Sequence, residues 1–160
     1  MDALQNLTTF FKQHVIDAKS LTVWAEDGAV FCGQSDVVDG FELEYTAIVF
    51  IQAATLKPHV LFMHLVNWLN KHDPERVEKN LPAPTFATEI LDNGKCDIKI
   101  KIDLLESYSL EESEQGNWKQ HDTRYDCISD FDLTVTTTDE IDELHELVYF
   151  VGHTDDLPCN

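Results

Sequence analysis

The chain has 160 residues, of which 43% are hydrophobic and 10% aromatic, which is enough to build a core and too much for a wholly disordered chain. Thirty Asp and Glu residues against eleven Lys and Arg residues give a formal net charge of -19, whereas a nucleic-acid-binding surface must neutralise phosphates. These numbers predict one domain over residues 1–160 and argue against direct binding of DNA or RNA.

The first predicted element is a helix over residues 3–17, with Asp2 available as its N-cap. Four apolar residues recur at helical spacing and form the stripe that should face a core. They are Leu4, Leu7, Phe11 and Val15.

A β-hairpin is the next predicted element. Two β-rich segments, Leu21–Glu26 and Ala29–Cys32, lie on either side of Asp27-Gly28, a dipeptide typical of two-residue hairpin turns. We expect a loop to follow over Gln34–Gly40.

A strand and a helix follow. Residues 41–51 alternate apolar and polar side chains until Ile48 and Phe50 make the second face apolar too, so the end of this strand should be covered on both sides. Pro58 suits the first turn of a helix, and Asp73-Pro74 should end it. The apolar stripe of this helix consists of Leu61, Phe62, Leu65, Val66, Trp68 and Leu69.

The register of a second hairpin can be predicted from side-chain chemistry. A two-residue turn at Asn93-Gly94 would place Phe86 opposite Lys101 and mix the two faces of the strands. A three-residue loop, Asp92–Gly94 with its glycine left-handed, instead pairs Phe86 with Ile100. We therefore predict the three-residue loop, followed by a strand whose core face holds Cys96, Ile98, Ile100, Ile102 and Leu104.

The last third of the chain is less periodic. Residues 106–124 are polar and acidic, and we expect a loop there. Residues 131–135 alternate like one more strand, and Thr138 or Asp139 is a candidate cap for a short amphipathic helix, although residues 147–151 fit a strand equally well. Residues 153–160 should form a loose tail. These elements predict an α+β fold in which an N-terminal and a central helix pack on an antiparallel or mixed sheet of about five to six strands.

The negative charge is concentrated toward the C-terminus. Residues 1–102 hold 14 acids and 9 bases, whereas residues 103–160 hold 16 acids and 2 bases. The simplest interpretation is a solvated, soluble face. Two functional interpretations remain open: a ring whose like charge keeps passing DNA from adhering, or an acidic mimic of DNA that occupies a basic partner.

Composition and motifs give no reason to expect an enzyme, a cofactor or a metal site. The four cysteines lie far apart without zinc-ligand spacing, and no leader or membrane-spanning run is visible, so reduced thiols in a cytoplasm are expected. The chain has no GxSxG motif and no phosphate-binding glycine loop. His59 and His64 are five residues apart and point away from a shared helix face, so they are poor joint ligands.

Four residues are candidates for a protein interface: Glu42, Glu44, Trp118 and Tyr125. Trp118 lies in a polar segment, where an exposed aromatic side chain is a typical anchor for a partner. The alternative is that Trp118 folds back onto the sheet.

Residues 41–107 resemble a known family. The segments FELEYTAIVF, HVLFMHLVNWLNKHDPE, ATEILDNG and CDIKIKIDLLE are similar to the R-type tail completion protein of contractile-tailed, peduovirus-like temperate phages. The resemblance is looser before Phe41 and is lost after Ser107. The motifs are specific in combination, although each is weak alone.

The resemblance implies a structural, non-enzymatic role in virion assembly. Such a protein would finish the contractile tail at its head-proximal end and make it competent to join a filled head. It would be assembled in the bacterial host cytoplasm and reside in the virion tail, as a hexameric ring in contact with the tail tube protein and other completion proteins. The chief alternative is an acidic DNA-mimic inhibitor of a host DNA-binding protein.

Overall fold

A computed structural model describes residues 1–15, 18–33 and 36–131 of the chain. It confirms the α+β prediction, with an N-terminal helix, one further helix and an antiparallel sheet of six strands. The elements in chain order are α1 (Asp2–His14), β1 (Ser20–Phe31), β2 (Gly40–Ala54), α2 (Pro58–His72), β3 (Thr85–Ile90), a 3-10 turn (Asp92–Gly94), β4 (Cys96–Glu112), β5 (Trp118–Gln120) and β6 (Thr123–Ser129).

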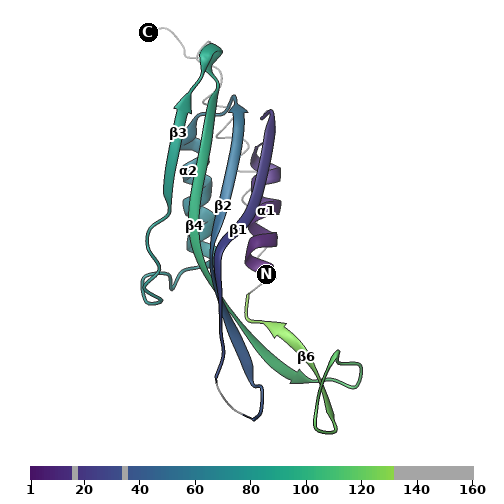
Figure 1. The fold of residues 1–160 in the computed structure, drawn as a ribbon. Coiled ribbons are helices and arrows are strands. Elements are labelled where there is room, and N and C mark those ends of the chain that lie inside the picture. Colours follow the sequence, from purple (N-terminus) through teal and green to yellow (C-terminus); the bar gives the residue numbers. More distant parts are fainter. Residues whose placement is uncertain (16–17, 34–35, 132–160) are drawn as a thin grey trace, which may run out of the picture.

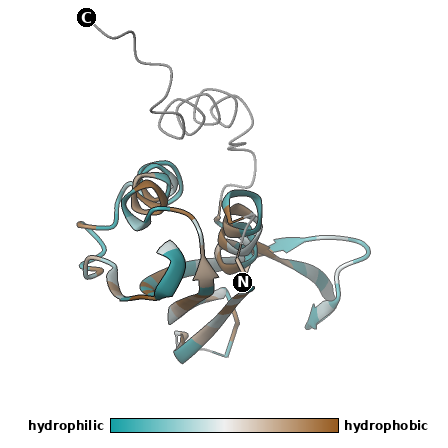
Figure 2. Ribbon diagram, turned by 90° about the horizontal axis from the view of Figure 1, so that it is seen from above, coloured by the Kyte–Doolittle hydropathy of each residue, from teal (hydrophilic) through white to brown (hydrophobic). Residues whose placement is uncertain are grey.

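The molecule has two layers in one half and a bare sheet in the other. The strands follow the order β1-β2-β4-β6-β5, and β3 pairs with the first part of β4. Both helices lie on the same face of the sheet (Figures 1 and 2). β1, β2 and β4 continue beyond the helices, and β5 and β6 join β4 only in that uncovered half (Figure 1).

The core lies between the helices and the sheet, as the strand alternation predicts. One face of β2 and β4 supplies side chains that are 0–5% exposed, and the helices cover them. The sheet contributes Tyr45, Ala47, Val49, Ile51, Ala54, Cys96, Ile98, Ile100, Ile102 and Leu104; the helices contribute Ala3, Leu7, Phe10, Phe11, Leu61, Leu65 and Trp68. Trp68 also joins the two helices, because its indole Nε1 donates a hydrogen bond of 2.8 Å to Asn6 of α1.

The predicted hairpin register is confirmed. Phe86 pairs with Ile100, and the three-residue turn over Asp92–Gly94 separates β3 from β4. Gly94 has a φ of 72°, as expected, and Asn93 is also left-handed with a φ of 66°. The end of α2 is confirmed as well, because Asp73 forms its C-cap.

The predicted N-cap of the first helix is wrong. Asp2 lies inside α1, and Met1 occupies the N-cap position without a side-chain hydrogen bond. The free N–H groups at this end are instead bonded by a carboxylate from β4, described below. The helix itself ends at His14, a few residues before the predicted boundary.

The predicted hairpin at Asp27-Gly28 is also wrong. β1 runs without a reversal from Ser20 to Phe31 and pairs along its length with β2. The two residues form a β-bulge: the register shifts between Glu26 and Ala29, and Asp27 has a φ of 54°. A left-handed residue followed by glycine fits a bulge as well as a turn. The bulge forms here because β2 is long enough to pair with β1 on both sides of it.

The segment 106–124, expected to be a loop, is largely strand. β4 continues to Glu112, and β5 pairs with β6. Polar residues are stable in this strand because β2 and β6 supply its backbone partners, so little side-chain burial is needed. The elements predicted over 132–151 and the tail predicted over 153–160 lie outside the described residues.

Candidate functional site

The uncovered half of the sheet carries most of the charge of the described chain. We call it the acidic arm and define it as residues 26–44 and 107–129 (Figure 1). These two segments hold 11 acids and 2 bases, a net charge of -9, whereas residues 1–25, 45–106 and 130–131 hold 11 acids and 9 bases, a net charge of -2. The described part of the chain therefore has a nearly neutral body and a strongly acidic arm.

All four predicted interface residues lie in the acidic arm. Trp118 and Tyr125 lie directly opposite each other on β5 and β6, and Trp118 is 47% exposed. Glu42 and Glu44 are exposed on β2. Strand alternation places the two glutamates on the face of the sheet opposite to Tyr125, so the four residues form two small groups rather than one site.

Sequence reasoning missed the exposed apolar side chains of β1 and its neighbours in the arm. Val30, which is 67% exposed, and Phe31, which is 50% exposed, end β1. The other large apolar side chains exposed in the arm are Val37, Val38 and Ile128. An acidic surface interspersed with exposed apolar side chains is suited to contact with another protein. The apolar run Ala29–Phe31 at the end of β1 could have indicated this exposed surface. It was instead interpreted as the second strand of a hairpin.

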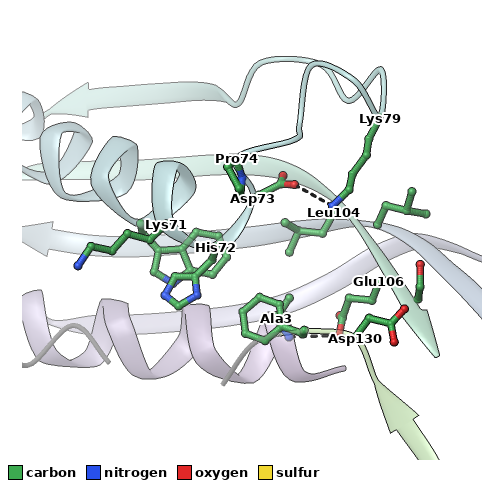
Figure 3. Close-up of a pocket in the computed structure, with 13 residues that line it drawn as sticks. Ala3, Lys71, His72, Asp73, Pro74, Lys79, Leu104, Glu106 and Asp130 are labelled. Atoms are coloured by element: carbon green, nitrogen blue, oxygen red, sulfur yellow. Dashed lines mark hydrogen bonds and ion pairs between the residues drawn. The ribbon is translucent and has the colours of Figure 1, made fainter. Parts of the chain in front are cut away.

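Glu106 anchors the arm to the body. Its side chain is 3% exposed, and one carboxylate oxygen accepts hydrogen bonds from the backbone N–H groups of Asp2, at 2.7 Å, and Ala3, at 3.2 Å. These N–H groups are among those that an α-helix leaves without an internal partner, and the helix dipole favours a negative charge there. Figure 3 shows Glu106 reaching from β4 toward Ala3.

Two tyrosine hydroxyls complete the hydrogen bonds of Glu106. Tyr45 donates to one carboxylate oxygen, and Tyr108 donates to the other at 3.0 Å. Burial, together with the hydrogen bond to this carboxylate, raises the pKa of Tyr108 to about 12 and also raises the pKa of Tyr45. Both hydroxyls therefore stay protonated and remain donors at neutral pH.

Arg76 fills the gap that the sheet leaves between β3 and β6. Its guanidinium donates to the backbone carbonyl of Asp103 at 2.8 Å, at a point of β4 that neither β3 nor β6 reaches. It also donates to Asp73 at 2.9 Å and to the carbonyl of Pro82. Arg76 is 9% exposed and Asp73 8% exposed, so this is a buried ion pair with its hydrogen bonds satisfied.

A cavity of about 300 Å³ lies beside Glu106 and Asp73, between the ends of the helices and β4 (Figure 3). Its lining includes two basic side chains, Lys71 and Lys79, and the acidic side chains of Glu106 and Asp130. No group of three metal-ligating side chains occurs among residues 1–15, 18–33 and 36–131. The cavity therefore offers mixed charges but no clustered metal ligands within that part of the chain.

His59 and His64, expected to be poor joint ligands, have different surroundings, because His59 is exposed in the first turn of α2. His64 is buried in α2, where its ring stacks on His14 of α1 with centroids 4.3 Å apart. Burial lowers the pKa of His64 from its ordinary value, so the ring is neutral at physiological pH. His64 is thus part of the packing between the helices.

Comparison with known families gives a match over most of the chain. The family model described as P2 phage tail completion protein R (GpR) matches residues 1–126. No curated protein and no solved structure matches. The family match extends beyond residues 41–107, which carry the sequence resemblance, and it includes α1, β5 and part of β6.

Proposed function

Because the chain belongs to the P2 phage tail completion protein R (GpR) family, we propose that it completes the phage tail at its head-proximal end and makes that tail competent to join a filled head. The observation that carries this proposal is the family match over residues 1–126, which covers both helices and most of the acidic arm. The role is structural and non-enzymatic. Its place is in the virion tail.

The acidic arm is the proposed contact surface for other tail or head-completion proteins, with the tail tube protein as the first candidate. Trp118 and Tyr125 would contribute aromatic area, and Glu42 and Glu44 would select a basic partner surface. The net charge of -9 on the arm supports a protein partner and weighs against DNA. The described helices are too short and polar to be candidates for crossing a membrane.

We further propose that six copies form a ring on the tail. A ring with cyclic symmetry uses head-to-tail contacts, in which two different surfaces of each subunit meet. The nearly neutral body is the part of the chain that can approach a neighbouring copy with the least electrostatic repulsion.

The proposal is tested by complementation in a phage or prophage that lacks this protein. Wild type should restore tails joined to heads in electron micrographs, and the double variant Trp118→Ala/Tyr125→Ala should leave tails unjoined. Asp92→Ala, in the β3–β4 turn, is the matched control and should complement fully. Normal head-joined tails in the complete absence of the protein would refute the proposed role. Recovery of a basic DNA-binding host protein in place of tail proteins would instead favour the DNA-mimic alternative.

A further inference from the structure

The edge strand β3 is exposed along its whole length. All six of its residues are exposed, including Phe86 at 61% and Ile90 at 85%. β3 pairs with β4 on one side, and within residues 1–15, 18–33 and 36–131 no strand pairs with its other side. Such an edge presents unpaired backbone groups to any strand that can lie beside it.

Hydrogen bonds of β4 identify which residues of β3 face the open edge. The carbonyl of Asp103 points to the β3 side of β4, so the odd-numbered residues of β4 bond toward β3. Their partners in β3 are Thr85, Ala87 and Glu89. The N–H and C=O groups of the alternate residues, Phe86, Thr88 and Ile90, therefore point outward.

The usual protections of an edge strand are missing from β3. Its register with β4 is continuous from residue 85 to residue 90, without a bulge, and it contains no proline and only one charged side chain, Glu89. An apolar patch continues from it onto α2, because Phe62 packs against Phe86 with ring centroids 4.4 Å apart. Val66, which is 54% exposed, lies one turn after Phe62 on the helix surface, and Met63, which is 62% exposed, is in turn a neighbour of Val66.

The sequence of β3 is complementary to itself when read antiparallel. With a twofold axis at Thr88, each Phe86 lies opposite Ile90 of the second copy, and each Ala87 lies opposite Glu89. Moving the axis to Glu89 would place two glutamates opposite each other, and moving it to Ala87 would leave Phe86 opposite a threonine. The axis at Thr88 matches the apolar side chains and also lets the two outward-facing threonines exchange backbone hydrogen bonds.

Charge favours the same arrangement. Residues 47–104, which include β3 and α2, hold seven acids and seven bases. An antiparallel pair of β3 strands joins these neutral regions and directs the two acidic arms toward opposite ends of the dimer (Figure 1). The arms therefore do not repel each other at close range.

We propose that the free protein forms a twofold dimer through β3, in which the two sheets join at Thr88 and the α2 patches, made of Phe62, Met63 and Val66, flank the junction. This interface is isologous, and a cyclic ring needs head-to-tail contacts. The dimer is therefore the form of the unassembled protein, and it separates when a ring is built. It shields an edge that would otherwise pair with other chains.

Cross-linking through one introduced cysteine, with the buried Cys96 left in place, tests the dimer and its register. Residues directly opposite in such a pair have Cα atoms about 5.5 Å apart, within the range of a disulfide. In a full-length background with Cys32, Cys127 and Cys159 changed to Ser, Thr88→Cys should give a disulfide-linked dimer under mild oxidation. Ala87→Cys is the matched control and should give no disulfide-linked dimer, since Ala87 lies opposite Glu89 of the second copy rather than opposite its own counterpart. Absence of a Thr88→Cys dimer, or equally efficient cross-linking of Ala87→Cys, would overturn the proposal.

Sedimentation of the full chain over a range of protein concentrations gives an independent test. Thr88→Pro removes an outward N–H without breaking a bond to β4, and it should weaken dimerisation on the order of tenfold or more, because two intermolecular bonds are lost. Thr88→Ala keeps the N–H and should dimerise like the wild type. A monomeric wild type at every concentration, or equal association of Thr88→Pro and Thr88→Ala, would contradict the interface. Neither result depends on the role in the tail, which complementation tests separately.

Discussion

The anchor at Glu106 leads to a sharp prediction about stability. Glu106→Gln keeps the size and shape of the side chain but removes its charge and one acceptor oxygen. The remaining oxygen can still accept from the N–H groups of Asp2 and Ala3. The new amide then faces the hydroxyl of Tyr45, which must turn from donor to acceptor.

The expected cost follows from the bonds that change. A hydrogen bond to a charged group contributes about 1.5–3 kcal/mol, and a negative charge at a helix N-terminus adds about 0.3–1 kcal/mol. Losing the charge and one acceptor should lower the free energy of unfolding by about 2–4 kcal/mol, a large share of the roughly 5–15 kcal/mol that a domain has. Because Glu106 bonds to the first turn of α1, that helix should lose protection first.

Urea unfolding followed by circular dichroism measures the total loss, and hydrogen exchange locates it. Glu112→Gln is the matched control, because it removes the same charge from an exposed position on the same strand. The control should stay within about 0.5 kcal/mol of the wild type. If Glu106→Gln unfolds as the wild type does, or if α1 keeps its protection, the anchor does not hold the helix as described.

Four further outcomes are expected. The pKa of His64 is lowered from 6.5 by burial, so its contribution to stability is complete above that pH and is lost as the pH falls; His64→Phe should flatten the decline in urea midpoint below pH 6.5. The pKa of Tyr108 is raised from 10.0 to about 12, so stability should fall as the pH rises above 10, and an ultraviolet titration that shows this group ionising near 10 in the folded protein would contradict its bond to Glu106. Gly116→Ala places a Cβ 2.4 Å from the backbone of Tyr125 in β6, which should distort the acidic arm. Complementation should therefore be impaired, while the melting temperature of the protein should change little because the core is untouched. Ile100→Asp buries a charge at a position that is 1% exposed, and soluble folded protein should be absent from expression trials.

Local chemistry was enough to predict several elements. Pro58 and Asp73-Pro74 bracket α2, since proline fits the first turn of a helix and disfavours its continuation. The register of β3 with β4 followed from matching apolar faces across a short loop. The family could also be recognised from residues that are close together in the chain.

Other elements depended on partners far away in the sequence. Asp27-Gly28 fits a turn and a bulge equally well, and pairing of β1 with the whole of β2 decides for the bulge. Apolar residues do not alternate regularly at the polar end of β4, and its strand conformation depends on backbone hydrogen bonds to β2 and β6. The candidate residues Trp118 and Tyr125 were named singly, and only the pairing of β5 with β6 places them side by side.

Residues close together in the chain were enough to predict the family, the α+β class, the bounds of α2 and the β3–β4 turn, because they set the backbone preferences and the period of the apolar side chains. Contacts between distant segments were needed to place most of the net charge of the described residues in a projecting arm, and to show that Glu106, 104 residues from Asp2, caps the first helix. A carboxylate carries no local sign of which distant N–H groups it will meet. Its partner is selected when the sheet and the helix pack and leave those donors without water.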